Sequence, residues 1–166
     1  MDLTKFFYWN DLNEGHSSQQ IIEKENPMYA LRSSSAIRSI LYGNAVFSGI
    51  SGLLFVFASQ PIARFLGIDM PLAILLLGTG LVGYAALIYI NASRPEISRS
   101  FVLFAVVADS IWVLLSIILL LTNWVPFTVP GKWAVGIVAA IVDVFATLQF
   151  FEWRKMLYFD AEHRIQ

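Results

Sequence analysis

Residues 100–122 read SFVLFAVVADSIWVLLSIILLLT, an apolar run with one carboxylate, Asp109, near its middle. An α-helix needs roughly 20 apolar residues to cross the hydrocarbon core of a bilayer, so this stretch predicts a membrane span. An ionisable side chain at the centre of such a span costs at least ~2.5 kcal/mol. Asp109 is therefore a candidate functional residue.

The composition of the chain also indicates a membrane protein. Its 166 residues are 57% hydrophobic and only 14% charged, whereas soluble domains carry about 25% charged residues. The absence of cysteine excludes disulfides, thiolate-bound metals and iron–sulfur clusters. The net charge of −1 gives no indication of a nucleic-acid partner. We expect the lipid bilayer to be the main partner.

Three further apolar stretches extend this prediction to an all-α bundle of four transmembrane helices. The expected spans are residues 36–58, 71–91, 100–122 and 133–153. Together they form one transmembrane domain, 36–153. An aromatic-rich tail, 1–35, precedes it and a short charged tail, 154–166, follows it.

The positions of the basic residues predict the orientation of the bundle. Of the 11 Lys and Arg residues, only Arg64 and Lys132 lie in the loops after the first and third spans. The others lie in the two tails, near the start of the first span, and in the loop around Arg94. By the positive-inside rule, both termini are expected in the cytoplasm.

Polar side chains in three of the spans are expected at one depth. Counted at ~1.5 Å per residue, Asn44, Asp109 and Asp143 all lie near the middle of the bilayer. They predict a shared polar layer. Because no Lys or Arg lies at that depth, Asp109 and Asp143 should hold at least one proton between them if they are in contact. The expected supporting residues are Ser48, Ser51, Tyr84, Trp112, Ser116 and Thr147.

Two roles for this polar layer remain open. A protonated Asp109 that donates to Asp143, to Asn44 or to a backbone carbonyl would join the helices, a contribution of about 1 kcal/mol. Alternatively, the carboxylates would relay protons or cations, or hold the polar head of a bound ligand.

The two halves of the chain share a pattern that favours a tandem repeat of two helical hairpins. A polar residue, an aromatic residue, a serine and a proline recur at equal offsets: Asn44, Phe47, Ser51 and Pro61, then Asp109, Trp112, Ser116 and Pro126. Parallel repeats are related by an axis along the membrane normal. Such a repeat would place Asn44 opposite Asp109.

Four consecutive aromatic residues stand outside the spans: Phe6, Phe7, Tyr8 and Trp9. One interpretation is an interfacial segment with its rings at headgroup depth. The other is a docking element for a larger partner, because clustered aromatic side chains dominate many interfaces.

Motifs of enzymes and cofactor sites are missing or out of context. Residues 78–83 match GxGxxG, but without the strand and the acidic residue that a dinucleotide site requires. We interpret this segment as a helix–helix contact. His16 and His163 both lie in tails, which disfavours a membrane haem. We therefore predict no enzymatic activity, no metal and no cofactor apart from a lipid-soluble ligand.

Three features together resemble a known pattern: Asn44 with its small-residue face, Arg94-Pro95 after the second span, and the segment DSIWV at 109–113. They are similar to an uncharacterised group of small bacterial four-helix integral membrane proteins. The resemblance covers residues 36–153. It implies a multi-pass protein of the bacterial cytoplasmic membrane, or of the thylakoid in a phototroph, and it implies no activity.

Three functions agree with these features. The small-residue faces and the aromatic tail favour an accessory or scaffolding subunit, which packs against partner membrane proteins or itself in a homo-oligomer or larger complex. The alternative is a small proton- or cation-coupled transporter that uses Asp109 and Asp143. A third is a binder of a lipid-soluble cofactor, such as a quinone or carotenoid, held beside Trp112 and Tyr84.

Overall fold

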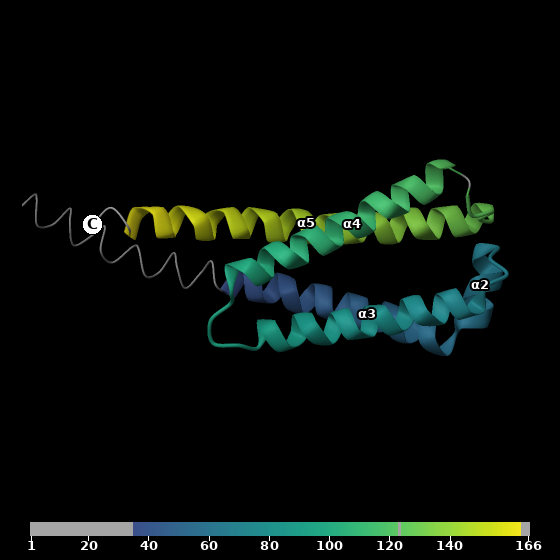
Figure 1. Cartoon of the computed structure of the whole chain (residues 1–166), viewed down its shortest axis with the longest axis horizontal. Coiled ribbons are helices and arrows are strands. Elements are labelled where there is room, and N and C mark those ends of the chain that lie inside the picture. The colour runs from purple at the N-terminus through teal and green to yellow at the C-terminus, as the bar shows by residue number, and fades with distance from the viewer. Residues whose placement is uncertain (1–34, 123, 164–166) are drawn as a thin grey trace, which may run out of the picture. The chain divides into compact units, whose positions relative to one another are not determined.

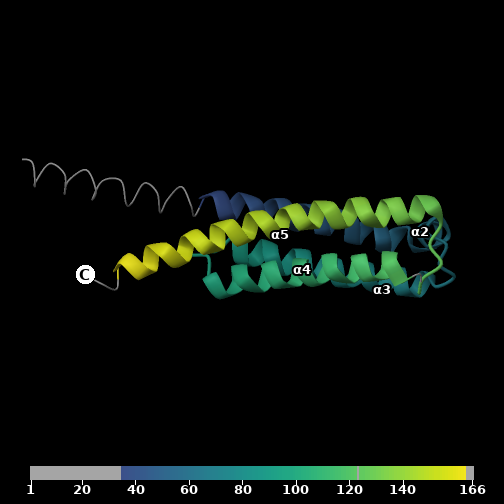
Figure 2. The same ribbon diagram turned by 90° about the horizontal axis from the view of Figure 1, so that it is seen from above.

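The computed structural model describes residues 35–122 and 124–163, with residues 158–163 described by their backbone alone. Within these ranges the chain is helical and contains no strand (Figures 1 and 2). The aromatic segment expected to dock a partner, Phe6, Phe7, Tyr8 and Trp9, lies outside the described residues.

Four long helices and one short helix make up the described chain. A first long helix, Ser35–Phe57, is followed by the short α2, Ser59–Leu66. The other long helices are α3 (Pro71–Ala92), α4 (Arg99–Thr122) and α5 (Val129–His163). The first helix, α3, α4 and the Val129–Leu157 part of α5 are each long and apolar enough to span a membrane. For the described residues, this confirms the prediction of an all-α fold with four membrane-capable helices.

The fourth long helix is longer than the expected span, 133–153. It begins at Val129 because Thr128 caps it: the Gly131 N–H donates to the Thr128 hydroxyl at 3.0 Å. At the other end α5 continues to His163, through most of the expected tail. Lys155 donates to Glu152 one turn earlier, and no proline follows Pro130. Hydropathy indicates where the apolar segment ends, whereas the helix continues until its backbone is capped or broken.

The long helices are arranged as two hairpins, one formed by the first helix and α3, the other by α4 and α5 (Figure 1). In the first hairpin the backbones approach closely at Gly52 and Gly78. A Cβ atom built on Gly78 would lie 2.8 Å from the Gly52 carbonyl oxygen and 2.6 Å from the Phe55 Cβ. Such close approach is typical of membrane helix pairs with small residues at the contact.

At one end of the bundle all four long helices meet in a buried apolar cluster. Its members are Ile37, Leu41, Ala45, Ile88, Ala92, Val102 and Ala105, with Trp153 of α5 packed against them. At the same end the Arg38 guanidinium donates to the carbonyl oxygens of Ala92, at 2.5 Å, and Pro95, at 3.0 Å. Arg38 thereby satisfies backbone acceptors where α3 ends. We call this end, which also carries Arg94 and Arg99, the arginine-rich end.

The opposite, or distal, end joins the two hairpins through α2. The Thr128 N–H donates to the Leu66 carbonyl at 2.9 Å, and the Thr128 hydroxyl donates to the Phe65 carbonyl at 2.6 Å. Gly67, with φ of 84°, ends α2 in a left-handed conformation that glycine adopts without strain. The two hairpins are therefore held together at both ends of the bundle.

Candidate functional site

Asp109 lies at the centre of a polar cluster to which each long helix contributes one residue. The Asn44 amide and the Gln149 amide both donate to Asp109 Oδ2, at 2.6 Å and 3.1 Å. The Tyr84 hydroxyl donates to Oδ1 at 2.8 Å. Asp109 is only 3% exposed. We call Asn44, Tyr84, Asp109 and Gln149 the polar cluster.

The helix faces explain how these side chains meet. In the first helix, Ile37, Leu41, Asn44 and Ser48 are all buried, and their spacing of three and four residues places them on one face. Ser48 donates to Asn44 Oδ1 at 3.2 Å. That contact uses the amide oxygen, so the amide nitrogen is left to donate to Asp109. Asn44 thus connects the first helix to α4.

Among the described residues, no basic side chain contacts Asp109 to offset the charge that it carries when ionised. The sequence has no Lys, Arg or His at residues 39–63, 65–93, 100–131 or 133–153. Among the described residues, Asp109 receives three hydrogen bonds: two at Oδ2 and one at Oδ1. A carboxylate can accept about four. Oδ1 therefore keeps capacity for a further donor or cation.

Asp143, which we expected in the same layer, does not join Asp109. It is exposed on α5, and Gln149 makes the contact from that helix instead. Gln149 lies six residues further along, a rise of about 9 Å. Asp143 also lies roughly a quarter turn away from the buried stripe of Ala139, Val142, Ala146 and Gln149. The expected contact between two carboxylates is therefore absent from the structure.

The expected supporting residues fall into three groups. Ser48 and Tyr84 contact the polar cluster, as described above. Ser51 and Trp112 line a cavity beside it. Ser116 donates to the Trp112 carbonyl of its own helix at 2.9 Å, and Thr147 is exposed on α5. Neither of the last two reaches the cluster.

Gln149 is the member of the cluster that the sequence analysis missed. Its signal was present in the proposed repeat. Asn44 and Asp109 are separated by 65 residues, and Tyr84 is the same distance in sequence from Gln149. Applying the repeat offset to Tyr84 would have identified Gln149.

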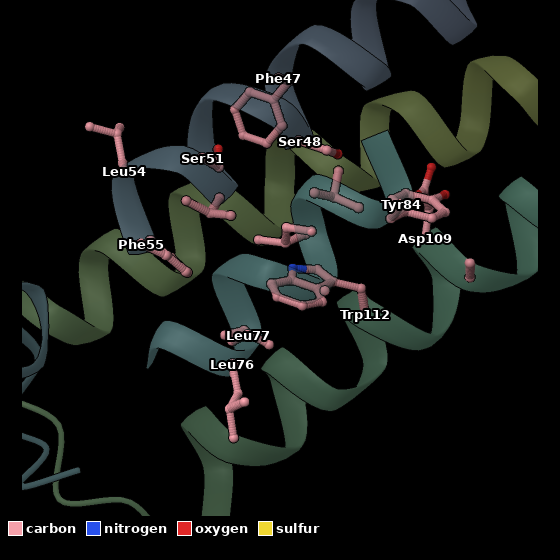
Figure 3. A pocket seen from close by; sticks show the side chains of 15 residues that line it. Phe47, Ser48, Ser51, Leu54, Phe55, Leu76, Leu77, Tyr84, Asp109 and Trp112 are labelled. Carbon is pink, nitrogen blue, oxygen red and sulfur yellow. The ribbon is translucent and has the colours of Figure 1, made fainter. Parts of the chain in front are cut away.

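A cavity of about 470 Å³ adjoins the polar cluster. It begins at Tyr84 and Asp109 and extends toward the distal end between the two hairpins (Figure 3). Aromatic rings of Phe47, Phe55 and Trp112 form part of its wall. The rest of the lining is mainly aliphatic. The cavity is thus an apolar space with a buried carboxyl group at one end.

Further features of the wall bear on what the cavity can hold. The Ser51 hydroxyl and the Trp112 indole N–H line it, and neither is hydrogen-bonded within the described part of the chain. Leu54 and Leu76 also line the cavity and are exposed by 56% and 64%. The rim therefore faces the surroundings of the bundle, which in a membrane are acyl chains.

The described residues contain no group of three His, Cys, Asp or Glu that could hold a metal ion. Comparisons of the chain with protein-family models, with curated proteins and with solved structures find no match. The class of protein is therefore defined by the fold alone. Four long apolar helices are consistent with a multi-pass membrane protein.

Proposed function

We propose that this protein binds a lipid-soluble molecule inside the membrane. The observation that carries the proposal is the cavity of about 470 Å³ that ends at the buried Asp109 carboxyl. Cavities that hold small organic molecules have volumes of about 300–1,000 Å³, with apolar walls and a few polar groups. This cavity has the same size and character.

The arrangement of the lining suggests how such a molecule would lie. Its apolar body would pack against Phe47, Phe55 and Trp112, and its polar head would reach Asp109 and Tyr84. Entry would occur from the lipid, across the exposed Leu54 and Leu76 at the rim. No reaction is needed for this role, so the proposed function is non-enzymatic.

Two glycines of α3 provide a matched test of the proposal. Gly80 lines the cavity and Gly83 does not. A Cβ atom at either position would meet nothing within 4 Å. Gly80→Phe should therefore narrow the cavity, whereas Gly83→Phe should add an equal ring elsewhere on the same helix. Neither substitution introduces a clash at its Cβ.

The measurement is photolabelling of the purified protein, in nanodiscs, with a long-chain alcohol that carries a diazirine. We expect mass spectrometry to locate the label on cavity-lining peptides of the first helix and α4. The label should be retained in Gly83→Phe and largely lost in Gly80→Phe. Equal labelling of these peptides in both variants, or labelling confined to outward-facing residues, would contradict the proposal.

A second candidate function, self-association as a scaffolding or accessory protein, is favoured by the position of Asp143. This carboxyl group and the Thr147 hydroxyl are both exposed near the middle of the long α5. Gly136 and Ala140 lie on the same face at helical spacing. Small residues beside polar side chains are typical of associating membrane helices. In a dimer whose axis follows the membrane normal, Asp143 would lie at the same depth as Asp143 of the second copy and about one turn from its Thr147.

For the cellular location, we propose a bacterial cytoplasmic membrane with both termini in the cytoplasm. The supporting observation is the arginine-rich end, where Arg38, Arg94 and Arg99 lie together with the start of the first helix. Cytoplasmic loops of membrane proteins carry such an excess of basic residues.

A further inference from the structure

The chemistry at the end of the cavity restricts the kind of polar head that it would accept. Asp109 lines the cavity, and its Oδ1 accepts one hydrogen bond, from Tyr84. What remains open there is an acceptor position. A quinone presents only acceptors and a hydrocarbon carotenoid presents no polar head, so neither matches an ionised carboxylate. A head that donates hydrogen bonds or carries positive charge would match it.

The lack of a basic partner for Asp109 favours a positively charged head over a neutral head that only donates hydrogen bonds. The spans contain no Lys, Arg or His that could neutralise Asp109. A charged group buried in an apolar environment is strongly unfavourable unless it is paired. Either a proton or a ligand cation would remove this cost, and a neutral ligand would not.

The cavity wall is also suited to a cation. The aromatic rings of Phe47, Phe55, Tyr84 and Trp112 all line it. The face of an aromatic ring attracts a positive charge, and the attraction is stronger when the pair is excluded from water. In Figure 3, Trp112 lies between the aliphatic part of the cavity and the polar end at Asp109 and Tyr84.

We propose that the ligand is a hydrophobic organic cation, such as a protonated alkylamine that carries an aromatic ring or a quaternary onium ion, whose charge lies against the Asp109 carboxylate. This inference rests on the proposed binding function and specifies its ligand. The cation and a proton compete for the same carboxyl group. Ligand affinity therefore increases with pH, because fewer protons then occupy Asp109.

The pH dependence of binding is assigned to Asp109 because few other titratable groups lie near it. Tyr84 of α3 is the titratable side chain in contact with it, while Asn44 and Gln149 do not titrate. Glu152 of α5 lies about one turn beyond Gln149 and pairs with Lys155. No other acidic or basic residue lies in the spans near the cluster except Asp143, which is exposed on α5.

The test uses the full chain in nanodiscs and tetraphenylphosphonium as the probe, with neutral triphenylphosphine oxide as a comparison. Equilibrium dialysis gives the dissociation constants for the unaltered protein and for Asp109→Asn, Gly80→Phe and Gly83→Phe. Loss of a charge-assisted contact should weaken binding of the cation by at least about tenfold in Asp109→Asn. Gly80→Phe should also lose binding, and Gly83→Phe should retain it.

The pH series provides a second readout that needs no change at Asp109. Cation binding to the unaltered protein should weaken as the pH falls, and binding to Asp109→Asn should not change with pH. If Asp109→Asn fails to fold, the pH series and the Gly80→Phe and Gly83→Phe pair decide the question.

Two results would overturn the inference: equal cation binding by the unaltered protein and Asp109→Asn, or no preference for the cation over the neutral oxide. Photolabelling by the diazirine alcohol separates the two proposals. If the alcohol labels the cavity but the cation does not bind, the ligand class is wrong and the binding function stands. If neither occupies the cavity, both proposals fail.

Discussion

Asp109 and Asp143 carry the same side chain but have opposite surroundings. Asp109 is buried and receives three hydrogen bonds from three other helices. Asp143 is exposed on α5, and no hydrogen bond to it is found among the described residues. A carboxyl group that faces lipid near mid-membrane is costly, by about 2.5–3.5 kcal/mol. Asp109 is therefore suited to a site inside the bundle, and Asp143 to a contact outside it.

The substitution Asp143→Leu should weaken self-association. Interhelical polar contacts in membranes contribute about 0.6 kcal/mol on average and up to about 1.7 kcal/mol. The dissociation constant of the dimer should therefore increase by about three- to twentyfold. Energy transfer between labelled copies, measured over a dilution series in liposomes, gives this constant. The neighbouring Val144→Leu is the control, because Val144 is also exposed but carries no polar group. An unchanged dissociation constant in Asp143→Leu would show that this face of α5 does not form the dimer interface.

At the scale of single helices, the glycine-rich segment of α3 has two different roles. The interpretation as a helix–helix contact holds for Gly78, which lies against the backbone of the first helix at Gly52. Gly80 and Gly83 have open space around the position of a Cβ. The GxGxxG motif thus contains one glycine that packs against a neighbouring helix and two at which a side chain could be added without a clash.

Gly78→Ala should destabilise the first hairpin. The added Cβ would lie 2.6 Å from the Phe55 Cβ, so the first helix and α3 must separate. Overpacking of this kind costs about 1–3 kcal/mol. Gly83→Ala should be neutral or slightly stabilising, because alanine favours the helix over glycine. Thermal unfolding in one detergent, followed by circular dichroism, compares the two variants. Equal melting temperatures would show that this contact does not limit stability.

For the whole molecule, the members of the polar cluster follow the offset of the repeat of two hairpins, which stays a prediction from the sequence. Asn44 and Tyr84 of the first hairpin have Asp109 and Gln149 as counterparts, both at an offset of 65 residues. Buried apolar positions follow the same offset, as Ile37 corresponds to Val102. The two hairpins contribute different groups to the polar cluster, because its one carboxyl group, Asp109, comes from the second hairpin.

The predicted orientation can be tested with introduced cysteines, since the chain has none of its own. Asp69 and Glu96 are exposed and lie in the α2–α3 and α3–α4 connections. In intact bacterial cells, a membrane-impermeant maleimide should label Asp69→Cys. It should label Glu96→Cys only after permeabilisation, because the proposed orientation places the arginine-rich end in the cytoplasm. The reverse pattern would invert the topology.

The number and approximate positions of the membrane-capable helices follow from the sequence, because a bilayer of fixed thickness requires an apolar run of fixed length. The choice of Asp109 as a candidate functional residue follows in the same way, from the cost of a carboxyl group within such a run. The tertiary structure decided which polar side chains meet. Helices such as α3 and α4 are apolar on most sides, so hydropathy does not determine their rotation or relative depth. Packing of one helix against another placed Gln149 beside Asp109 and left Asp143 outside.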